Sequence, residues 1–161
     1  MITKDKYFIG FLAGIIASVP MDVLDFLIYI IFKILGYQHI VYADYATATL
    51  LEGKVSFNMF ELVAGQVFQI IHCGIVGSIY VVLLYVLKER SNLFKGWLIG
   101  IITWFIAYLT GVHDRIELFM MTEMYNVLAN LLTSSVFGIS MALVFQKLWR
   151  KFKPDENVYK I

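Results

Sequence analysis

The stretch LVAGQVFQIIHCGIVGSIYVVLLYVL, residues 62–87, contains no Lys, Arg, Asp or Glu. Residues 96–112 and 124–146 are also free of these charged side chains. A helix needs about 20 predominantly apolar residues to cross a bilayer, and every charge near the bilayer centre opposes insertion. We therefore interpret the three stretches as membrane spans.

A fourth apolar stretch begins near Tyr7 and runs to Leu35, although Asp22 and Asp25 interrupt it. One helix over this stretch would be ~43 Å long at 1.5 Å per residue, which exceeds the ~30 Å hydrocarbon layer. We expect this helix to tilt, to protrude or to break at Pro20.

The sequence thus predicts an all-α fold, a four-helix transmembrane bundle that forms a single domain over residues 1–161. The expected spans are about 7–35, 58–88, 94–112 and 123–149. Asn58 and Glu61 have the spacing of a capping box at the start of the second span. The connection before it is too long for a tight turn, so we expect a short amphipathic helix at about 40–52 on the outer membrane surface.

Apolar side chains dominate the composition. Hydrophobic residues make up 60% of the chain and charged residues 16%, and the mean hydropathy is +0.77, which indicates lipid as the solvent for much of the surface. The formal net charge of +1 argues against nucleic acid as a partner, because nucleic-acid-binding proteins carry basic faces. Cys73 is the single cysteine, which excludes an intramolecular disulfide and a relay between paired cysteines, as in four-span membrane thiol oxidoreductases.

Basic residues are distributed unequally between the two sets of connections. The amino-terminal segment, the connection near 88–95 and the carboxyl end together carry ten Lys and Arg residues, against two or three on the opposite side. Cytoplasmic loops of membrane proteins are enriched in these residues. We therefore predict a multi-pass protein of the cytoplasmic membrane with both termini in the cytoplasm.

An octet in the first span recurs in the third. GFLAGIIA at residues 10–17 and GWLIGIIT at residues 96–103 are identical at five of eight positions. A tandem duplication and a chance recurrence of apolar residues both explain the similarity of the two octets. The small residues spaced four apart favour close helix packing, within one chain or in a homodimer. The expected partners are the lipid bilayer and a second copy or another membrane protein.

One polar residue from each predicted span lies at the same depth, ~23 to 26 Å from the inner membrane face at 1.5 Å per residue. These residues are Asp22, His72, His113 and Asn130. Asp25 and Gln69 extend this polar layer on the same helices, and Asp114 lies at the outer end of the third span. Ionisable groups at membrane depth are costly enough to suggest a function, so the layer is a candidate ligand site or ion pathway.

Three interpretations of the polar layer are open. Asp22 or Asp25 pairs with His72, His113 or Arg115 and holds the bundle together; or the layer carries protons, ions or a polar solute; or it binds a metal ion. The candidate metal ligands are Asp22, His72 and His113. No HxxxH or ExxH motif supports the metal interpretation, and the sequence leaves any cofactor unknown. We interpret His39, in the outer connection, as solvated or interfacial.

The GxxxG opening, the motif Pro20-Met21-Asp22-x-x-Asp25 and four spans in about 160 residues resemble uncharacterised bacterial four-span membrane proteins, which are classed as domains of unknown function. The resemblance covers about Tyr7 to Arg150. It implies a bacterial cytoplasmic membrane and no assigned activity. The favoured hypothesis is a non-enzymatic membrane component that the polar layer holds together. The alternatives are a small carrier of protons, ions or polar solutes, and a metal-binding membrane enzyme.

Overall fold

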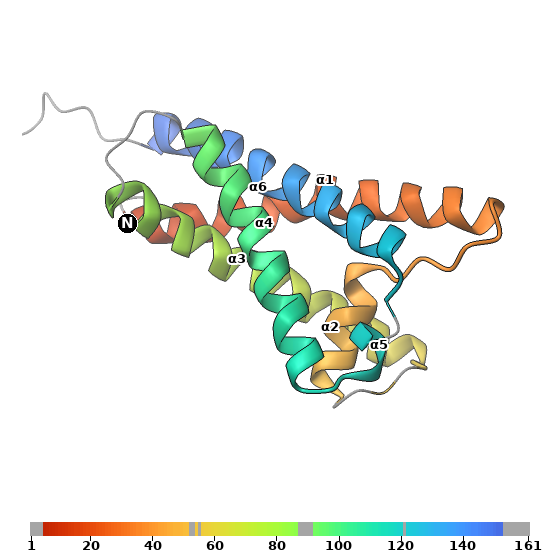
Figure 1. Cartoon of the computed structure of the whole chain (residues 1–161). Helices are drawn as coiled ribbons and strands as arrows, with labels where there is room; N and C mark the ends of the chain where they lie inside the picture. Colours follow the sequence, from red (N-terminus) through yellow and green to blue (C-terminus); the bar gives the residue numbers. More distant parts are fainter. Residues whose placement is uncertain (1–4, 52–53, 55, 87–91, 121, 153–161) are drawn as a thin grey trace, which may run out of the picture.

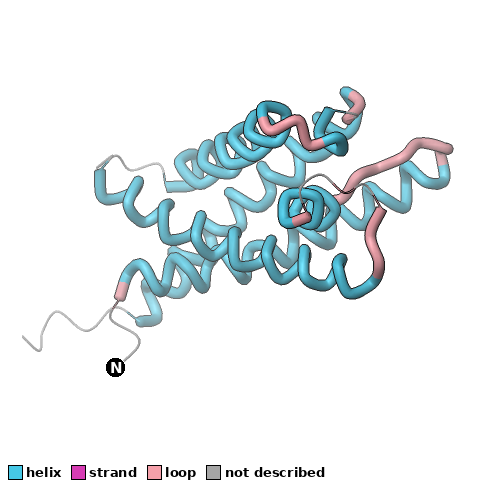
Figure 2. Tube along the Cα trace, turned by 90° about the horizontal axis from the view of Figure 1, so that it is seen from below, coloured by secondary structure: helices cyan, strands magenta, loops and turns pink. Residues whose placement is uncertain are grey.

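The computed structural model describes residues 5–51, 54, 56–86, 92–120 and 122–152. In these residues all regular secondary structure is helical, and Figure 2 shows long helices side by side, joined by loops. The helices are α1 (Lys6–Ile34), α2 (Tyr42–Leu50), α3 (Met59–Val86), α4 (Asn92–His113), α5 (Glu117–Met120) and α6 (Met124–Phe152). The four long helices are apolar enough to span a membrane, which confirms the predicted four-helix bundle.

Local signals place the ends of α1. The Asp5 carboxylate accepts a hydrogen bond from the Tyr7 backbone N–H at 2.8 Å and caps the first turn. The helix continues without interruption through Pro20, so of the three predicted alternatives the break does not occur. Its far end extends beyond the rest of the bundle (Figure 1).

The capping box predicted for the second span is present. The Asn58 side chain accepts from the Glu61 N–H at 3.0 Å, and the Glu61 carboxylate accepts from the Asn58 N–H at 2.8 Å. These two bonds satisfy backbone donors that the first turn of a helix leaves free. α3 accordingly begins at Met59.

The helix ends that the charge pattern assigns to one membrane face lie together at one end of the bundle (Figure 1). The Lys6 ammonium of α1 lies 5.2 Å from the ring centre of Trp149 on α6. The Tyr80 hydroxyl of α3 donates to the carbonyl of Asn92, the first residue of α4, at 3.0 Å. The basic residues at 4, 88, 90, 153 and 160 lie outside the described residues.

Glycines bring the long helices together in two pairs. In the α1–α3 pair, a Cβ atom on Gly10 would lie 2.5 Å from the carbonyl oxygen of Gly77. In the α4–α6 pair, a Cβ atom on Gly96 would lie 2.5 Å from the carbonyl oxygen of Gly138. Neither distance leaves room for a side chain, so the small residues are used for packing inside the chain. A homodimer would need a different surface.

The two helix crossings at these glycines have the same alignment: the contacts follow one another at the same spacing along both helix pairs. One turn further along, Gly14 lies against Cys73 in the first pair, and Gly100 lies against Ser134 in the second. Each half of the chain also has the same order of elements, a long helix, a short helix and a second long helix. The repeated octets therefore belong to a larger structural repeat, which supports a tandem duplication.

The two halves differ where α2 enters the bundle. α1 packs along the length of α6. The repeat relates α1 to α4 and α6 to α3, but α3 and α4 pack together much less extensively. α2 lies against α3, and its Tyr42 and Tyr45 rings lie 5.3 and 5.4 Å from the ring of Trp104 on α4. α2 therefore separates α3 from α4. This short helix was predicted, but Tyr45, Thr47 and Ala48 are buried against the bundle, and residue 52 of the expected range lies outside the described residues.

Candidate functional site

The turn after α1 brings His39 back to the helix that precedes it. Gly36 has φ +80°, a backbone conformation that favours glycine. Its N–H donates to the Lys33 carbonyl at 3.3 Å, and the Tyr37 N–H donates to the Phe32 carbonyl at 2.9 Å. This pair of bonds is a Schellman motif, which ends a helix and redirects the chain. The following residues run back along α1 and place His39 opposite Asp25.

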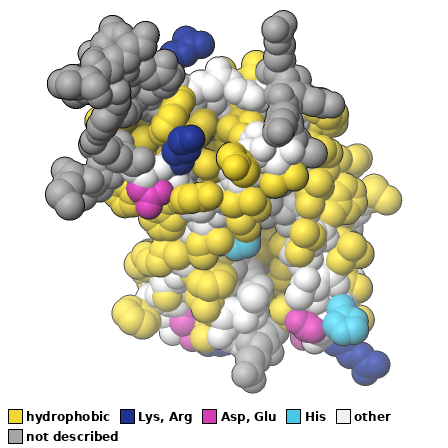
Figure 3. Space-filling model, turned by 90° about the vertical axis from the view of Figure 1, so that its left-hand side faces the viewer, with side chains coloured by type: hydrophobic (Ala, Val, Ile, Leu, Met, Phe, Trp, Pro, Cys, Tyr) yellow, Lys and Arg dark blue, Asp and Glu magenta, His cyan; other side chains and the backbone are white. Residues whose placement is uncertain are grey.

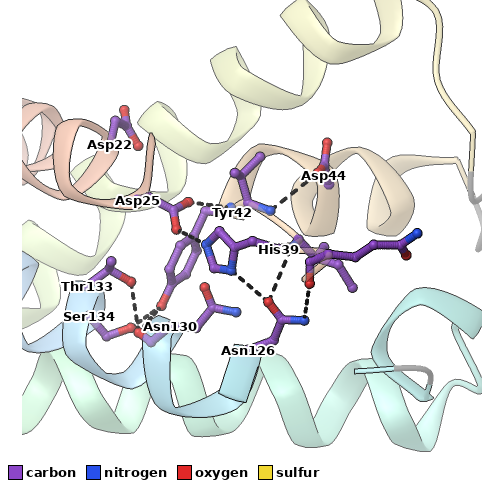
Figure 4. Close-up of polar contacts among 12 residues, drawn as sticks. Asp22, Asp25, His39, Tyr42, Asp44, Asn126, Asn130, Thr133 and Ser134 are labelled. Carbon is purple, nitrogen blue, oxygen red and sulfur yellow. Dashed lines mark hydrogen bonds and ion pairs between the residues drawn. The ribbon is translucent and has the colours of Figure 1, made fainter. Parts of the chain in front are cut away.

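His39 joins three separate parts of the chain (Figure 4). Its Nε2 atom lies 2.8 Å from Oδ1 of Asp25 on α1, and its Nδ1 atom lies 2.6 Å from Oδ1 of Asn126 on α6. The Tyr42 backbone N–H at the start of α2 donates to the second oxygen of Asp25 at 2.8 Å. We call Asp25, His39, Tyr42 and Asn126 the His39 network. It connects α1, α2 and α6.

The hydrogen-bonding partners in the network place one proton on His39 and leave a second proton shared between His39 and Asp25. The Asn126 amide nitrogen donates to the Gln38 carbonyl at 3.0 Å, so the Asn126 oxygen accepts and Nδ1 of His39 carries a hydrogen. The contact between Nε2 and the Asp25 carboxyl group then needs one proton, which either the imidazole or the carboxyl group holds. Both forms leave the pair with no net charge. Removal of either partner from such a buried pair leaves the other uncompensated, which is strongly destabilising.

Burial shields the His39 network. The side chain of His39 is 0% exposed and that of Asp25 is 4% exposed. The Phe32 ring packs edge-on against the imidazole at 5.4 Å between ring centres. Because water is excluded, the hydrogen bonds are stronger than they would be at a surface, and the loss of one partner is costly.

The Tyr42 side chain extends the network toward the middle of α6. Its hydroxyl donates to the Asn130 carbonyl at 2.9 Å and contacts the Ser134 hydroxyl. Burial raises the pKa of the Tyr42 hydroxyl above its usual range, so this group stays protonated and acts as a donor. Tyr42 thus connects α2 to α1 through its backbone N–H and to α6 through its side chain.

Asp22 lies in a second polar group, between α1 and α3. Its two carboxylate oxygens accept from the side-chain amides of Gln66 at 3.0 Å and Gln69 at 2.6 Å. We call these three residues the Asp22 group. A recess of about 300 Å³ borders the group and is lined by Asp22, Asp25, Phe26, Val41, Ala43, Gln66 and Gln69.

Two buried amides occupy equivalent positions in the structural repeat. Gln69 precedes the crossing glycine Gly77 by eight residues on α3, as Asn130 precedes Gly138 on α6. Gln69 is 5% exposed and Asn130 is 0% exposed. Within the described part of the chain, Oε1 of Gln69 and both side-chain polar atoms of Asn130 have no hydrogen-bond partner. Such buried unpaired atoms are rare in folded proteins and need an explanation.

The residues of the predicted polar layer are divided between the His39 network and the Asp22 group, and some of them belong to neither. Asp22 is hydrogen-bonded to Gln69, and Asp25 is hydrogen-bonded to His39. Neither carboxyl group pairs with His72, His113 or Arg115. The pairing predicted for the two carboxylates is therefore wrong. Depth along a helix does not determine which way a side chain points, and the side chain at position 72 borders the space between α3 and α4 instead. His113, Asp114 and Arg115 are exposed at the outer end of α4.

The interpretation of His39 as a solvated or interfacial residue is also wrong, because its side chain is buried. Loop position suggested solvent, whereas the Gly36 turn returns the loop to α1. The available sequence signal was Gly36 directly after an apolar helical stretch, which is the usual C-terminal position for a Schellman motif. Tyr42 and Asn126 carry no comparable signal.

The fold and these polar groups define the class of protein, a multi-span membrane protein with four candidate spanning helices. No family model, curated protein or solved structure matches the chain. The resemblance to bacterial four-span proteins stays a prediction. Among the described residues, no three His, Cys, Asp or Glu side chains are grouped so that they could hold a metal ion.

Proposed function

We propose that this chain is a non-enzymatic component of a bacterial cytoplasmic membrane, a four-span bundle whose outer end is held together by the His39 network. The observation that carries the proposal is the mutual pairing of Asp25, His39 and Asn126 in a buried site. Their polar atoms form hydrogen bonds with one another and with the nearby backbone. A network of this kind specifies which helices meet and in which register.

The proposed orientation places both termini in the cytoplasm. It is supported by the excess of Lys and Arg in the amino-terminal segment, the α3–α4 connection and the carboxyl end. α2, α5 and the His39 network then lie toward the outer leaflet. There the network fixes α2 between α3 and α4 and gives the bundle a defined outer surface for a lipid or protein partner.

A small carrier of protons, ions or polar solutes is the second candidate. The recess beside the Asp22 group favours it, because two carboxyl groups and two amides line that space. Ionisable groups that line a cavity inside a membrane are typical of transport pathways.

Flux and stability measurements on the same variants separate the two candidates. Wild-type protein and Asp22→Asn are reconstituted into liposomes, and pH-driven and potential-driven flux is recorded together with thermal stability in detergent. We expect no flux above that of empty liposomes from either protein. Flux in the wild type that Asp22→Asn abolishes without lowering the melting temperature would replace our proposal with the carrier.

A further inference from the structure

A cavity of about 430 Å³ lies where α3 and α4 separate. Its walls come from α2, α3, α4, α5 and α6, with one residue of α1, and the lining residues include Tyr45, Phe68, Trp104 and Phe119. α1 and α6, which the repeat relates to α4 and α3, pack closely. The space between α3 and α4 therefore results from the insertion of α2. Its volume falls within the range of small-molecule binding sites in proteins.

The cavity can be entered from the side of the bundle. Phe68 and Ile79 of α3 and Ile106 of α4 line it, and these side chains are 39%, 51% and 60% exposed. Figure 3 shows a broad hydrophobic belt between two charged edges, with a histidine visible in a recess of that belt. In a membrane this belt faces lipid, so an apolar chain can reach the cavity without crossing water.

The cavity wall includes polar residues, among them Gln69, Thr110 and Asp114. The amide nitrogen of Gln69 donates to Oδ1 of Asp22 at 2.6 Å. The amide oxygen therefore points away from Asp22. This oxygen is buried and has no partner in the described part of the chain, so it lacks a hydrogen-bond donor. His72, three residues further along α3, also lines the cavity.

We propose that the cavity binds a single-chain amphiphile whose head group donates a hydrogen bond to Oε1 of Gln69. The apolar chain lies between α3 and α4, against Trp104, and the head group lies at the boundary with the Asp22 group. A hydroxyl and an ammonium group both supply the required donor. An ammonium would in addition approach the Asp22 carboxylate. The His39 network holds α2, which forms one wall of the cavity. Amphiphile binding is nevertheless measured separately from flux and stability, so a failure of this site and a failure of the function proposed above are distinguishable.

Quenching of Trp104 fluorescence tests the site in the full chain. Trp97 and Trp149 are first replaced by Phe so that Trp104 is the only indole. The protein is reconstituted in nanodiscs and titrated with alkyl compounds of equal length that carry bromine at the chain end. The three probes are an alcohol, a primary amine and a methyl ether. Bromine quenches indole on contact, so bound chains reduce emission.

We expect saturable quenching by the alcohol and the amine, and binding about tenfold weaker for the ether, which has no donor. Tighter binding of the amine than of the alcohol would indicate a carboxylate as a second contact, either Asp22 beside Gln69 or Asp114 in the cavity wall. Ala107→Phe, which fills the cavity, should remove saturable quenching. Ala64→Phe makes the same change on an exposed part of α3 outside the cavity and should not.

Two results would overturn the proposal. The first is quenching that rises linearly with probe in the membrane and is equal in Ala107→Phe and Ala64→Phe, which indicates contact with surrounding lipid only. The second is equal binding of the ether and the alcohol, which removes the role of the Gln69 oxygen. Gln69→Met adds a direct test where it folds, and the ether comparison does not depend on that variant.

Discussion

Nε2 of His39 lies 2.8 Å from Oδ1 of Asp25, with both side chains buried. A loop residue is thereby paired with a carboxyl group inside a membrane-spanning helix. Asn126 completes the connection to α6 through the other ring nitrogen. The chain thus uses one histidine to hold the α1–α2 connection against two long helices, and this arrangement accounts for a carboxyl group at that depth.

Replacement of His39 should destabilise the bundle, whereas replacement of another histidine should not. His39→Ala leaves Asp25 buried without its partner, and the expected loss is about 3 to 5 kcal/mol. His113→Ala, at an exposed position, is the matched control and should change stability by about 0.5 kcal/mol or less. Chemical denaturation in mixed micelles measures both. Equal losses for the two variants would contradict a special role for His39.

Alanine at either crossing glycine should weaken the helix pair to which it belongs. The added Cβ atom of Gly10→Ala or Gly96→Ala would overlap the carbonyl oxygen of Gly77 or Gly138. Overpacking of this kind costs about 1 to 3 kcal/mol. Because the crossings share one register, we expect similar losses for the two variants. Val19→Ala, on the exposed surface of α1, serves as the control. A loss at Gly10 with none at Gly96 would argue against the repeat.

The stability contribution of Asp44 should fall as pH rises. Burial raises the pKa of the Asp44 carboxyl group above its ordinary value of 3.8, and the hydrogen bond from the Val41 N–H opposes part of that rise. A group with a raised pKa in the folded state contributes its stability below the unfolded pKa and loses it as pH rises through the folded pKa. Above about pH 4, wild type should therefore lose stability relative to Asp44→Asn.

The measurement is the difference in melting temperature between wild type and Asp44→Asn at about pH 4 and about pH 7. The variant keeps an oxygen that can accept from Val41 but does not ionise. We expect the difference to move in favour of the variant at the higher pH. A difference that is independent of pH would show that Asp44 ionises as readily in the folded chain as in the unfolded one.

Labelling with a membrane-impermeant thiol reagent tests the proposed orientation. In a Cys73→Ala background, Glu117→Cys should react in intact cells, because α5 lies toward the outer face. Lys151→Cys, near the end of α6, should react only after lysis. Both positions are exposed in the structure. The reverse pattern of labelling would mean that the chain is inserted with its termini outside.

The sequence predicted the spans and one capping box because these depend on short stretches of chain. Apolar stretches insert into lipid wherever they occur, and Asn58 and Glu61 interact across a single turn. The His39 network depends instead on the φ of Gly36 and on the rotation of α1 and α6 about their axes. The depth of Asp22 and Gln69 was enough to predict that they share a layer, but not that His72 points toward a different helix pair. α5, with four residues, is too short to produce a periodic signal.

A double-mutant cycle on Asp25 and His39 tests the proposed role of the network most directly. The free energy of unfolding is measured for wild type, Asp25→Ala, His39→Ala and the double variant in the same mixed micelles. Direct pairing predicts that the double variant loses less stability than the sum of the single losses, with a coupling energy of about 1 to 3 kcal/mol. Additive losses, with a coupling energy below about 0.5 kcal/mol, would contradict it.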